Sequence, residues 1–193
     1  MKSEERVAIA KTKSKLAPRR QVAGDVQLGA LNFVKKMNIP GSPATDKDLE
    51  TLYDRGYRLY NSGRYKDAAQ FFFLIQIAHP TEPRYAMASA ATYHMMKEYE
   101  GAINLYKIAS ILDPSDPTAE YHRADCYLKK FDLMGAWIAL TMCIKRCEGK
   151  PEHEMLKERA QALLNSLDAQ LKEMKSRGIV NFNEEARRQA KGG

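Results

Sequence analysis

The sequence has few of the residues from which catalytic, metal and disulfide sites are built. Its 193 residues include three cysteines whose spacing forms no disulfide framework, which is typical of a reducing cytoplasm. It has no glycine-rich phosphate loop, no Cys-x-x-Cys pair and no nucleophile elbow, so we expect no enzyme activity and no cofactor. The longest apolar cluster, Phe71 to Ile75, is far shorter than the roughly 20 residues of a membrane span, so we expect no direct membrane insertion. Residues 1–20 contain no secretory apolar region, so we expect a cytoplasmic protein.

Histidine and cysteine side chains lie four residues apart at two places, a spacing that can hold a metal on one helix face. The pairs are His122 with Cys126 and Cys143 with Cys147. Cys143, however, falls in a core column of the repeat described below, and cysteine is among the most buried residue types. We therefore favour packing over metal binding and expect no metal.

Positive charge is concentrated at the two ends of the chain. The net charge is +7, but residues 1–44 carry nine basic and three acidic residues, and residues 171–193 carry six and three. The middle, residues 45–170, carries sixteen basic and eighteen acidic residues and is slightly acidic. Nucleic-acid-binding domains usually show a basic stripe on the folded face, which the middle lacks. We therefore expect no nucleic-acid partner and interpret residues 1–24 and 177–193 as basic, mobile segments, although binding through these tails stays an alternative hypothesis.

The chain repeats itself with a period of 34 residues. Shifting the sequence by this length aligns three units, in which small, aromatic and aliphatic residues recur in six columns. The columns are Gly56, Ala90 and Ala124; Leu59, Tyr93 and Tyr127; Tyr65, Tyr99 and Leu133; Ala68, Ala102 and Ala136; Phe72, Tyr106 and Leu140; and Ile75, Ala109 and Cys143. Pro80 and Pro114 close the first two units, because proline cannot continue a helix. This period and pattern are the signature of the tetratricopeptide repeat.

The repeat predicts an all-α protein of three tandem tetratricopeptide helix pairs in a short right-handed solenoid. Small residues let the two helices of each pair approach closely, and the larger ones fill the space between pairs. The predicted repeats occupy residues 49–82, 83–116 and 117–150 within a domain of residues 45–176. The third unit departs from the pattern, since Phe131 stands where a turn glycine is common.

Two further helices are predicted at the ends of the repeats. Residues 151–176 form a capping helix, because apolar residues recur on one face and a solenoid must cover its last apolar surface. These residues are Leu156, Ala160, Leu163, Leu164, Leu167, Leu171 and Met174. Residues 25–44 hold an amphipathic helix and then a proline and glycine break. Its apolar residues are Val26, Ala30, Phe33, Val34 and Met37.

The first helix of each repeat lines the inner face of such a solenoid, and the inward positions can be counted along it. The candidate groove residues are Tyr53, Tyr57, Tyr60, Met87, Ala88, Ala91, His94, Met95, Tyr121, His122, Asp125 and Leu128. Tyrosine combines an apolar body with a polar tip, methionine adapts to varied partners, and alanine leaves room for inserted side chains. The set therefore predicts a groove that binds an extended peptide with apolar anchors.

Three stretches give the sequence a resemblance to a known family. They run from Gly56 to Phe72, from Leu112 to Leu128 and from Glu152 to Leu164. In these stretches, in the number of repeats and in the cap helix, the chain resembles the class II chaperones of bacterial type III secretion. The resemblance covers about residues 45–170.

The resemblance implies a non-enzymatic bacterial chaperone that keeps hydrophobic translocator proteins soluble and ready for export. It implies that an extended client segment lies in the groove. It also implies a homodimer through the N-terminal helix and the first repeat, which assigns dimerisation to the apolar residues of 25–44, and action with a transcription activator. A general tetratricopeptide scaffold or a transcription co-regulator stays the alternative.

Overall fold

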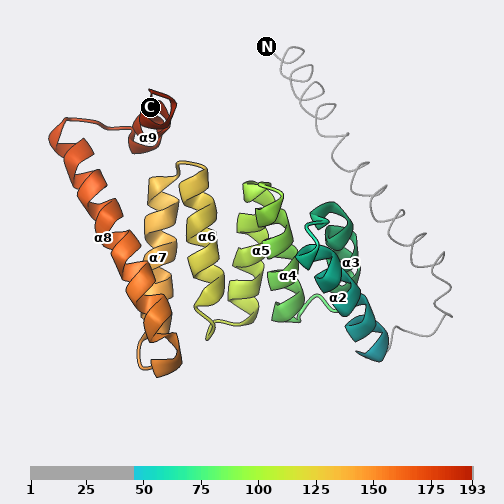
Figure 1. Ribbon diagram of the computed structural model, residues 1–193. Coiled ribbons are helices and arrows are strands. Elements are labelled where there is room, and N and C mark those ends of the chain that lie inside the picture. The colour runs from blue at the N-terminus through green and yellow to red at the C-terminus, as the bar shows by residue number, and fades with distance from the viewer. Residues whose placement is uncertain (1–45, 193) are drawn as a thin grey trace, which may run out of the picture. The chain divides into compact units, whose positions relative to one another are not determined.

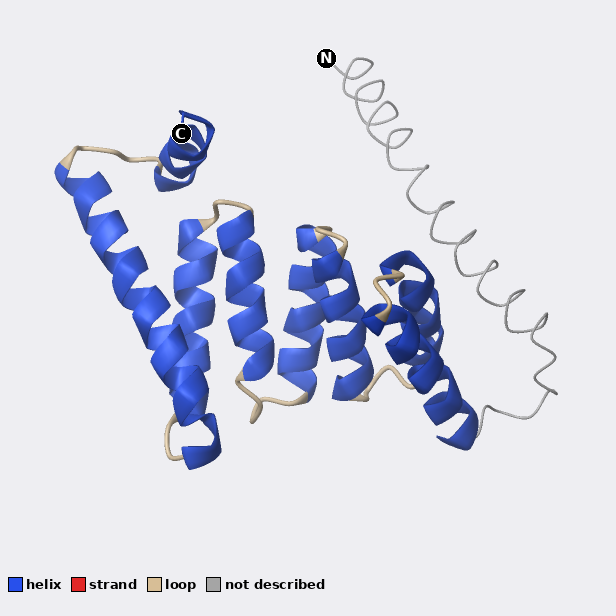
Figure 2. Ribbon diagram, viewed as in Figure 1, coloured by secondary structure: helices blue, strands red, loops and turns tan. Residues whose placement is uncertain are grey.

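The computed structural model describes residues 46–192, which are helical apart from short connections (Figures 1 and 2). The predicted segment 1–24 and the predicted helix within 25–44, with its proposed dimerisation residues, lie outside the described residues. The described α-helices are α2 (Asp46–Asn61), α3 (Tyr65–Ala78), α4 (Pro83–Met95), α5 (Tyr99–Leu112), α6 (Thr118–Lys129), α7 (Leu133–Cys147), α8 (Glu154–Ser176) and α9 (Phe182–Gly192). A 3-10 turn, Pro151–His153, precedes α8, and the described residues contain no strand. None of the described helices is long and apolar enough to cross a membrane.

Helices α2 to α7 form three successive pairs, and each pair packs on the next (Figure 1). Helix α4 contacts both α3 and α5, and α6 contacts both α5 and α7. Alanines at the predicted close-contact positions are fully buried, including Ala68, Ala90 and Ala124. The prediction of an all-α fold built from tandem tetratricopeptide pairs is therefore confirmed.

In the turn inside each pair, the residue at one fixed repeat position has a left-handed backbone conformation. Gly63, Lys97 and Phe131 have φ angles of 77°, 62° and 57°, and they lie 34 residues apart. In the first turn the N–H of Arg64 donates to the carbonyl of Leu59 over 2.9 Å, and the equivalent bonds recur in the other two turns. This pattern ends a helix by pairing its last carbonyls, and glycine suits it because it lacks a Cβ. Phe131 thus keeps the turn conformation without the glycine.

Glycines in the repeats leave room for aromatic rings of the partner helix. A Cβ added to Gly101 on α5 would lie 2.6 Å from Tyr93 Cδ1 on α4. One repeat later, a Cβ on Gly135 would lie 2.6 Å from Tyr127 Cδ1. Both pairs are eight residues apart in sequence, so this close approach repeats with the period of the fold.

Helix α8 covers the last pair, as the sequence predicted for a capping helix. Ala160, Leu167 and Met174 are buried in one cluster with Leu140 and Cys143 of α7. The prediction was wrong for Leu163, whose side chain is 38% exposed. The buried face of the helix is narrower than the apolar pattern suggested, because α8 packs mainly on one helix, α7.

The C-terminal segment differs from the mobile tail that its charge suggested. Helix α9 packs on α7, and Ala186 is buried in the same cluster as the α7–α8 core. Asn183 Oδ1 accepts a hydrogen bond of 3.0 Å from the N–H of Leu133, at the start of α7. Composition did not indicate this, because only a few residues anchor an otherwise charged helix: Ala186 and Phe182 pack against the core cluster, and Asn183 bonds to the start of α7.

Candidate functional site

The twelve candidate groove residues all keep solvent-accessible surface in the folded repeats. We call the surface that they form on α2, α4 and α6 the A-helix face. None of the twelve is buried, and Tyr57 and Met95 are 52% and 46% exposed. Ten of them are half-buried, so their backbones are supported by the fold while part of each side chain stays open. The positions counted along the sequence therefore lie at an accessible surface.

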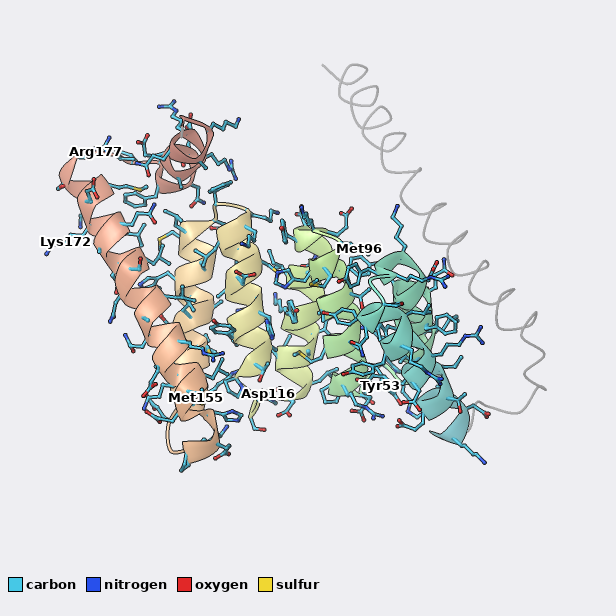
Figure 3. The ribbon with its side chains drawn as sticks, in the orientation of Figure 1. Tyr53, Met96, Asp116, Met155, Lys172 and Arg177 are labelled. Atoms are coloured by element: carbon cyan, nitrogen blue, oxygen red, sulfur yellow. The ribbon has the colours of Figure 1, made fainter. Side chains whose placement is uncertain are left out.

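The first part of the A-helix face is an aromatic cluster on α2 and α4. Tyr53, labelled in Figure 3, stacks on Tyr57 with ring centroids 6.4 Å apart. It also contacts the buried ring of Phe72 at 5.7 Å and that of Tyr85 at 5.9 Å. Burial raises the pKa of the Tyr53 hydroxyl above its ordinary value, so it stays protonated near neutral pH. Tyr53 thus supports the surface from below, and Tyr57 is its exposed member.

Arg84 ties this cluster together. Its guanidinium lies 4.7 Å from the centroid of the Tyr53 ring and 5.1 Å from that of Tyr85. It also pairs with the carboxylate of Glu50, which lies 34 residues earlier at the same repeat position. The hydrogen bond to Glu50 raises the pKa of Arg84 further above its ordinary range. Sequence counting missed Arg84, because its contacts depend on how α4 packs against α2.

The second part of the A-helix face is a polar cluster on α4 and α6. His94 Nε2 lies 2.9 Å from Asp125 Oδ2, and His94 Nδ1 lies 3.5 Å from the hydroxyl of Tyr106. The Nε2–H tautomer satisfies both contacts, because it donates to the carboxylate and accepts from the phenol. Tyr106 is buried, and burial raises the pKa of its hydroxyl far above the ordinary value. It acts as a neutral support beneath His94.

His122 lies beside this cluster and is held by ring contacts. Its ring stacks on Tyr106 with centroids 5.6 Å apart and meets His94 and Tyr121 edge to face. Burial, followed by repulsion from His94, lowers the pKa of His122, which favours the neutral imidazole. The structure therefore brings four predicted residues together here: His94, Tyr121, His122 and Asp125.

The remaining predicted residues do not join either cluster. Tyr60 packs against Tyr65 of α3, with ring centroids 5.3 Å apart. Leu128 packs against the core cluster of α7 and α8. Met87 packs on the cores of the second pair. Ala88 and Ala91 are half-buried, and Met95 is exposed.

A second exposed apolar surface lies on the second helices of the pairs. Sequence counting did not consider it, because it concentrated on the first helix of each repeat. Its exposed residues are Phe73, Ile77, Ile108, Ile111, Met134, Ile138 and Met142, and we call it the B-helix face. Between α3 and α5 this face opens into a cavity of about 560 Å³ lined by Phe73, Ile77 and Leu105. Ser89 of α4 also lines this cavity, and its buried hydroxyl has no hydrogen-bond partner among the described residues.

The three cysteines are buried, free thiols. Burial raises the pKa of Cys126 and of Cys143 to about 12 in each case, and it also raises the pKa of Cys147. These thiols therefore stay protonated at neutral pH, whereas metal binding and nucleophilic attack require the thiolate. The burial of Cys143 in the core agrees with its position in a repeat column.

Comparison with known proteins finds relatives that share these features. A tetratricopeptide-repeat family model matches residues 49–79 and 85–116, which hold the first two pairs. Low calcium response locus protein H of Yersinia pseudotuberculosis is 29% identical over 133 residues, covering 69% of this chain and 79% of that protein. The chaperone protein SicA of Salmonella typhimurium is 29% identical over 119 residues, covering 62% of this chain and 70% of SicA.

Solved structures agree with the sequence relatives. The translocator chaperone SycD of Yersinia enterocolitica superimposes with a TM-score of 0.63 at 26% identity, covering 66% of this chain and 88% of SycD. PcrH, a protein of Pseudomonas aeruginosa, gives a TM-score of 0.63 at 28% identity, covering 68% of this chain and 97% of PcrH. The chain is a tetratricopeptide-repeat homologue of the type III secretion translocator chaperones.

The solved relatives of this translocator-chaperone homologue include complexes. PcrH has been solved with the chaperone-binding regions of PopD and of PopB. SycD has been solved with a peptide of the translocator YopD and in an alternative dimer. The superposition with PcrH covers nearly all of that chain and about two thirds of this one.

Proposed function

We propose that this protein is a non-enzymatic, cytoplasmic secretion chaperone. In this proposal, the A-helix face forms a concave groove that binds an extended apolar segment of hydrophobic translocator proteins. The bound protein is thereby kept soluble and competent for export. We further propose that the chain forms a homodimer through residues 25–44 and that it acts with a transcription activator.

The observation that carries this proposal is the accessible set of aromatic and methionine side chains on the first helices of the three pairs, α2, α4 and α6. Tyr57 and Met95 are about half exposed, although burial of such side chains is favourable by roughly 1.5–3 kcal/mol each. Surfaces of this kind are typical of binding sites for apolar partners. The relatives PcrH and SycD, which bind translocator segments, support the assignment of that partner.

The alternative is a general scaffold or transcription co-regulator that joins folded partners. Such a partner would bind without an extended apolar segment, so peptides would not compete with it. The two functions are therefore separable by a peptide-binding experiment.

The test uses fluorescently labelled peptides of the chaperone-binding regions of PopD and PopB and the YopD peptide. We expect wild-type protein to bind at least one of them by fluorescence anisotropy, and Tyr57→Ala to weaken binding by about tenfold, as loss of an aromatic anchor does. Tyr57 suits the test better than Tyr53, because Tyr53 also packs against Phe72 and its removal would cost stability.

Met155→Ala is the matched control, since Met155 is 69% exposed on α8, away from the A-helix face. It should bind like wild type. If Tyr57→Ala binds normally while Ile77→Ser or Ile138→Ser does not, the client lies on the B-helix face and the groove assignment is wrong. If no peptide binds, the result favours the alternative function of a general scaffold or transcription co-regulator.

A further inference from the structure

Two imidazoles of the A-helix face differ in how their nitrogens are used. His94 is paired at both ring nitrogens, with Asp125 on one side and Tyr106 on the other. His122 is held by ring contacts alone and has no hydrogen-bond partner within residues 46–192. It is half-buried, so part of the ring faces the open surface. Its polar atoms therefore depend on solvent in the free protein.

This arrangement has a consequence when a ligand covers the A-helix face. A ligand lying between α4 and α6 removes water from His122. A buried polar group without a partner costs free energy comparable to a lost hydrogen bond, so a tightly bound ligand must supply a partner. In the free protein no described side chain does so, because His94, Tyr106 and Tyr121 present their rings to His122, and Asp125 and Asp116 act on it through their charge without a hydrogen bond.

We propose that His122 forms a hydrogen bond with one main-chain amide of the bound client segment and thereby fixes the register of that segment in the groove. This proposal rests on the proposed function. In this proposal, apolar contacts hold the side chains of the client, and the hydrogen bond from His122 is an additional polar contact to the client backbone.

The chemistry of the site favours an amide over a charged group. An extended segment cannot pair its own amides, so every main-chain N–H and C=O along it needs an external partner. A neutral imidazole offers one donor and one acceptor, which suits a neutral amide. Asp125, paired to His94 beside the site, disfavours a client carboxylate by like-charge repulsion, and neutral His122 offers no charge to attract one.

The experiment combines His122 variants with a backbone scan of the PopD chaperone-binding peptide. In the scan, one amide at a time is replaced by an ester, which removes the N–H and weakens the carbonyl acceptor at that linkage. We expect His122→Phe to weaken binding of the native peptide by about 3- to 10-fold, the effect of one hydrogen bond. At one linkage, the ester peptide should bind equally to wild type and to His122→Phe.

Two further variants separate a hydrogen-bonding role from a packing role. His122→Gln, which restores a polar group without the ring, should recover part of the lost affinity. His79→Phe is the matched control, since His79 is exposed at the end of α3, outside the A-helix face, and should bind like wild type. Circular dichroism checks that each variant is folded.

The outcomes separate this proposal from the function on which it rests. The proposal is overturned if His122→Phe binds the native peptide as tightly as wild type. It is also overturned if no ester peptide abolishes the effect of His122→Phe, while a peptide with one client side chain replaced by alanine does abolish it. That result would mean that His122 contacts a client side chain and not the backbone. Failure of wild-type protein to bind the PopD, PopB and YopD peptides would reject the proposed function and this proposal together.

Discussion

Glu120 Oε2 lies 2.6 Å from Arg123 Nη2, one turn further along α6, and the Glu120 side chain is only 2% exposed. Arg146 of α7 approaches the same carboxylate at 3.6 Å, and Ser110 of α5 donates a hydrogen bond to it. One buried carboxylate therefore connects three helices. This network lies behind the A-helix face and holds α6 against its neighbours.

Glu120→Gln should strongly destabilise the protein. The substitution keeps the side-chain volume but leaves two arginines without a counter-charge in a buried site. Removing one partner of a buried ion pair typically costs about 3–5 kcal/mol in the free energy of unfolding. Urea denaturation measures this. Glu100→Gln is the control, because Glu100 is 84% exposed in its pair with Lys130 and should change stability by at most about 1 kcal/mol. Equal effects of the two substitutions would contradict the role of burial.

Lys97→Gly should stabilise the protein. Lys97 is exposed and has a φ of 62°, a left-handed conformation that costs a residue with a Cβ about 1–2 kcal/mol. Glycine removes this strain, but it also gains entropy in the unfolded chain, so we expect a net gain of about 1 kcal/mol. Lys107→Gly, in the exposed middle of α5, should instead lose about 1 kcal/mol. A loss of stability in Lys97→Gly would show that the turn is not strained.

The effect of Gly101→Ala on the free energy of unfolding should change sign when the residue that faces position 101 is changed. In wild type the new Cβ would lie 2.6 Å from Tyr93 Cδ1, and overpacking of this kind costs about 1–3 kcal/mol. In a Tyr93→Ala background the space is open, and alanine should stabilise the helix by about 0.5–1 kcal/mol relative to glycine. Thermal and urea denaturation of wild type, Gly101→Ala, Tyr93→Ala and the double variant measure the effect of Gly101→Ala in both backgrounds. The same effect of Gly101→Ala in the two backgrounds would mean that the ring is not the obstacle.

The stability of the protein should fall as the pH falls below about 6.5, in part through His122. Its pKa is lowered in the folded protein by burial and by His94, so the unfolded chain binds the proton more readily. The loss of stability due to His122 is absent above the pKa of this residue in the unfolded chain, and it grows as the pH falls toward its pKa in the folded protein. His122→Phe should therefore have a shallower loss of stability between pH 7 and 5 than wild type, as urea midpoints can measure. Parallel curves for the two proteins would exclude His122 as a contributor.

The repeat and its ends were predictable because they are encoded in local periodicity. Six columns at a period of 34 residues predicted the helix pairs, and the spacing of leucines predicted α8. Even the substitution of Phe131 at a turn position left the turn unchanged, because the surrounding hydrogen bonds hold it in the left-handed conformation. Helix α9 was not predicted, since its position depends on Asn183 contacting Leu133, which lies 50 residues earlier.

For the site, counting along the first helix of each repeat identified positions that lie at an accessible surface, but it did not predict how they pair. Tyr53 and Tyr57 look equivalent in sequence, whereas the structure makes one a support and the other an exposed contact. Similarly, His94 and His122 look alike in sequence, whereas in the structure Asp125 and Tyr106 pair with the two ring nitrogens of His94 and with neither ring nitrogen of His122.

The sequence by itself determined the helix pairs, their order and the positions on the first helices that stay accessible to solvent, because these follow from a short-range period. Only the tertiary structure decided which side chains are satisfied and which stay available. That depends on contacts between α4, α5 and α6, where a difference of a few ångströms gives His94 two partners and leaves His122 with none among the described residues.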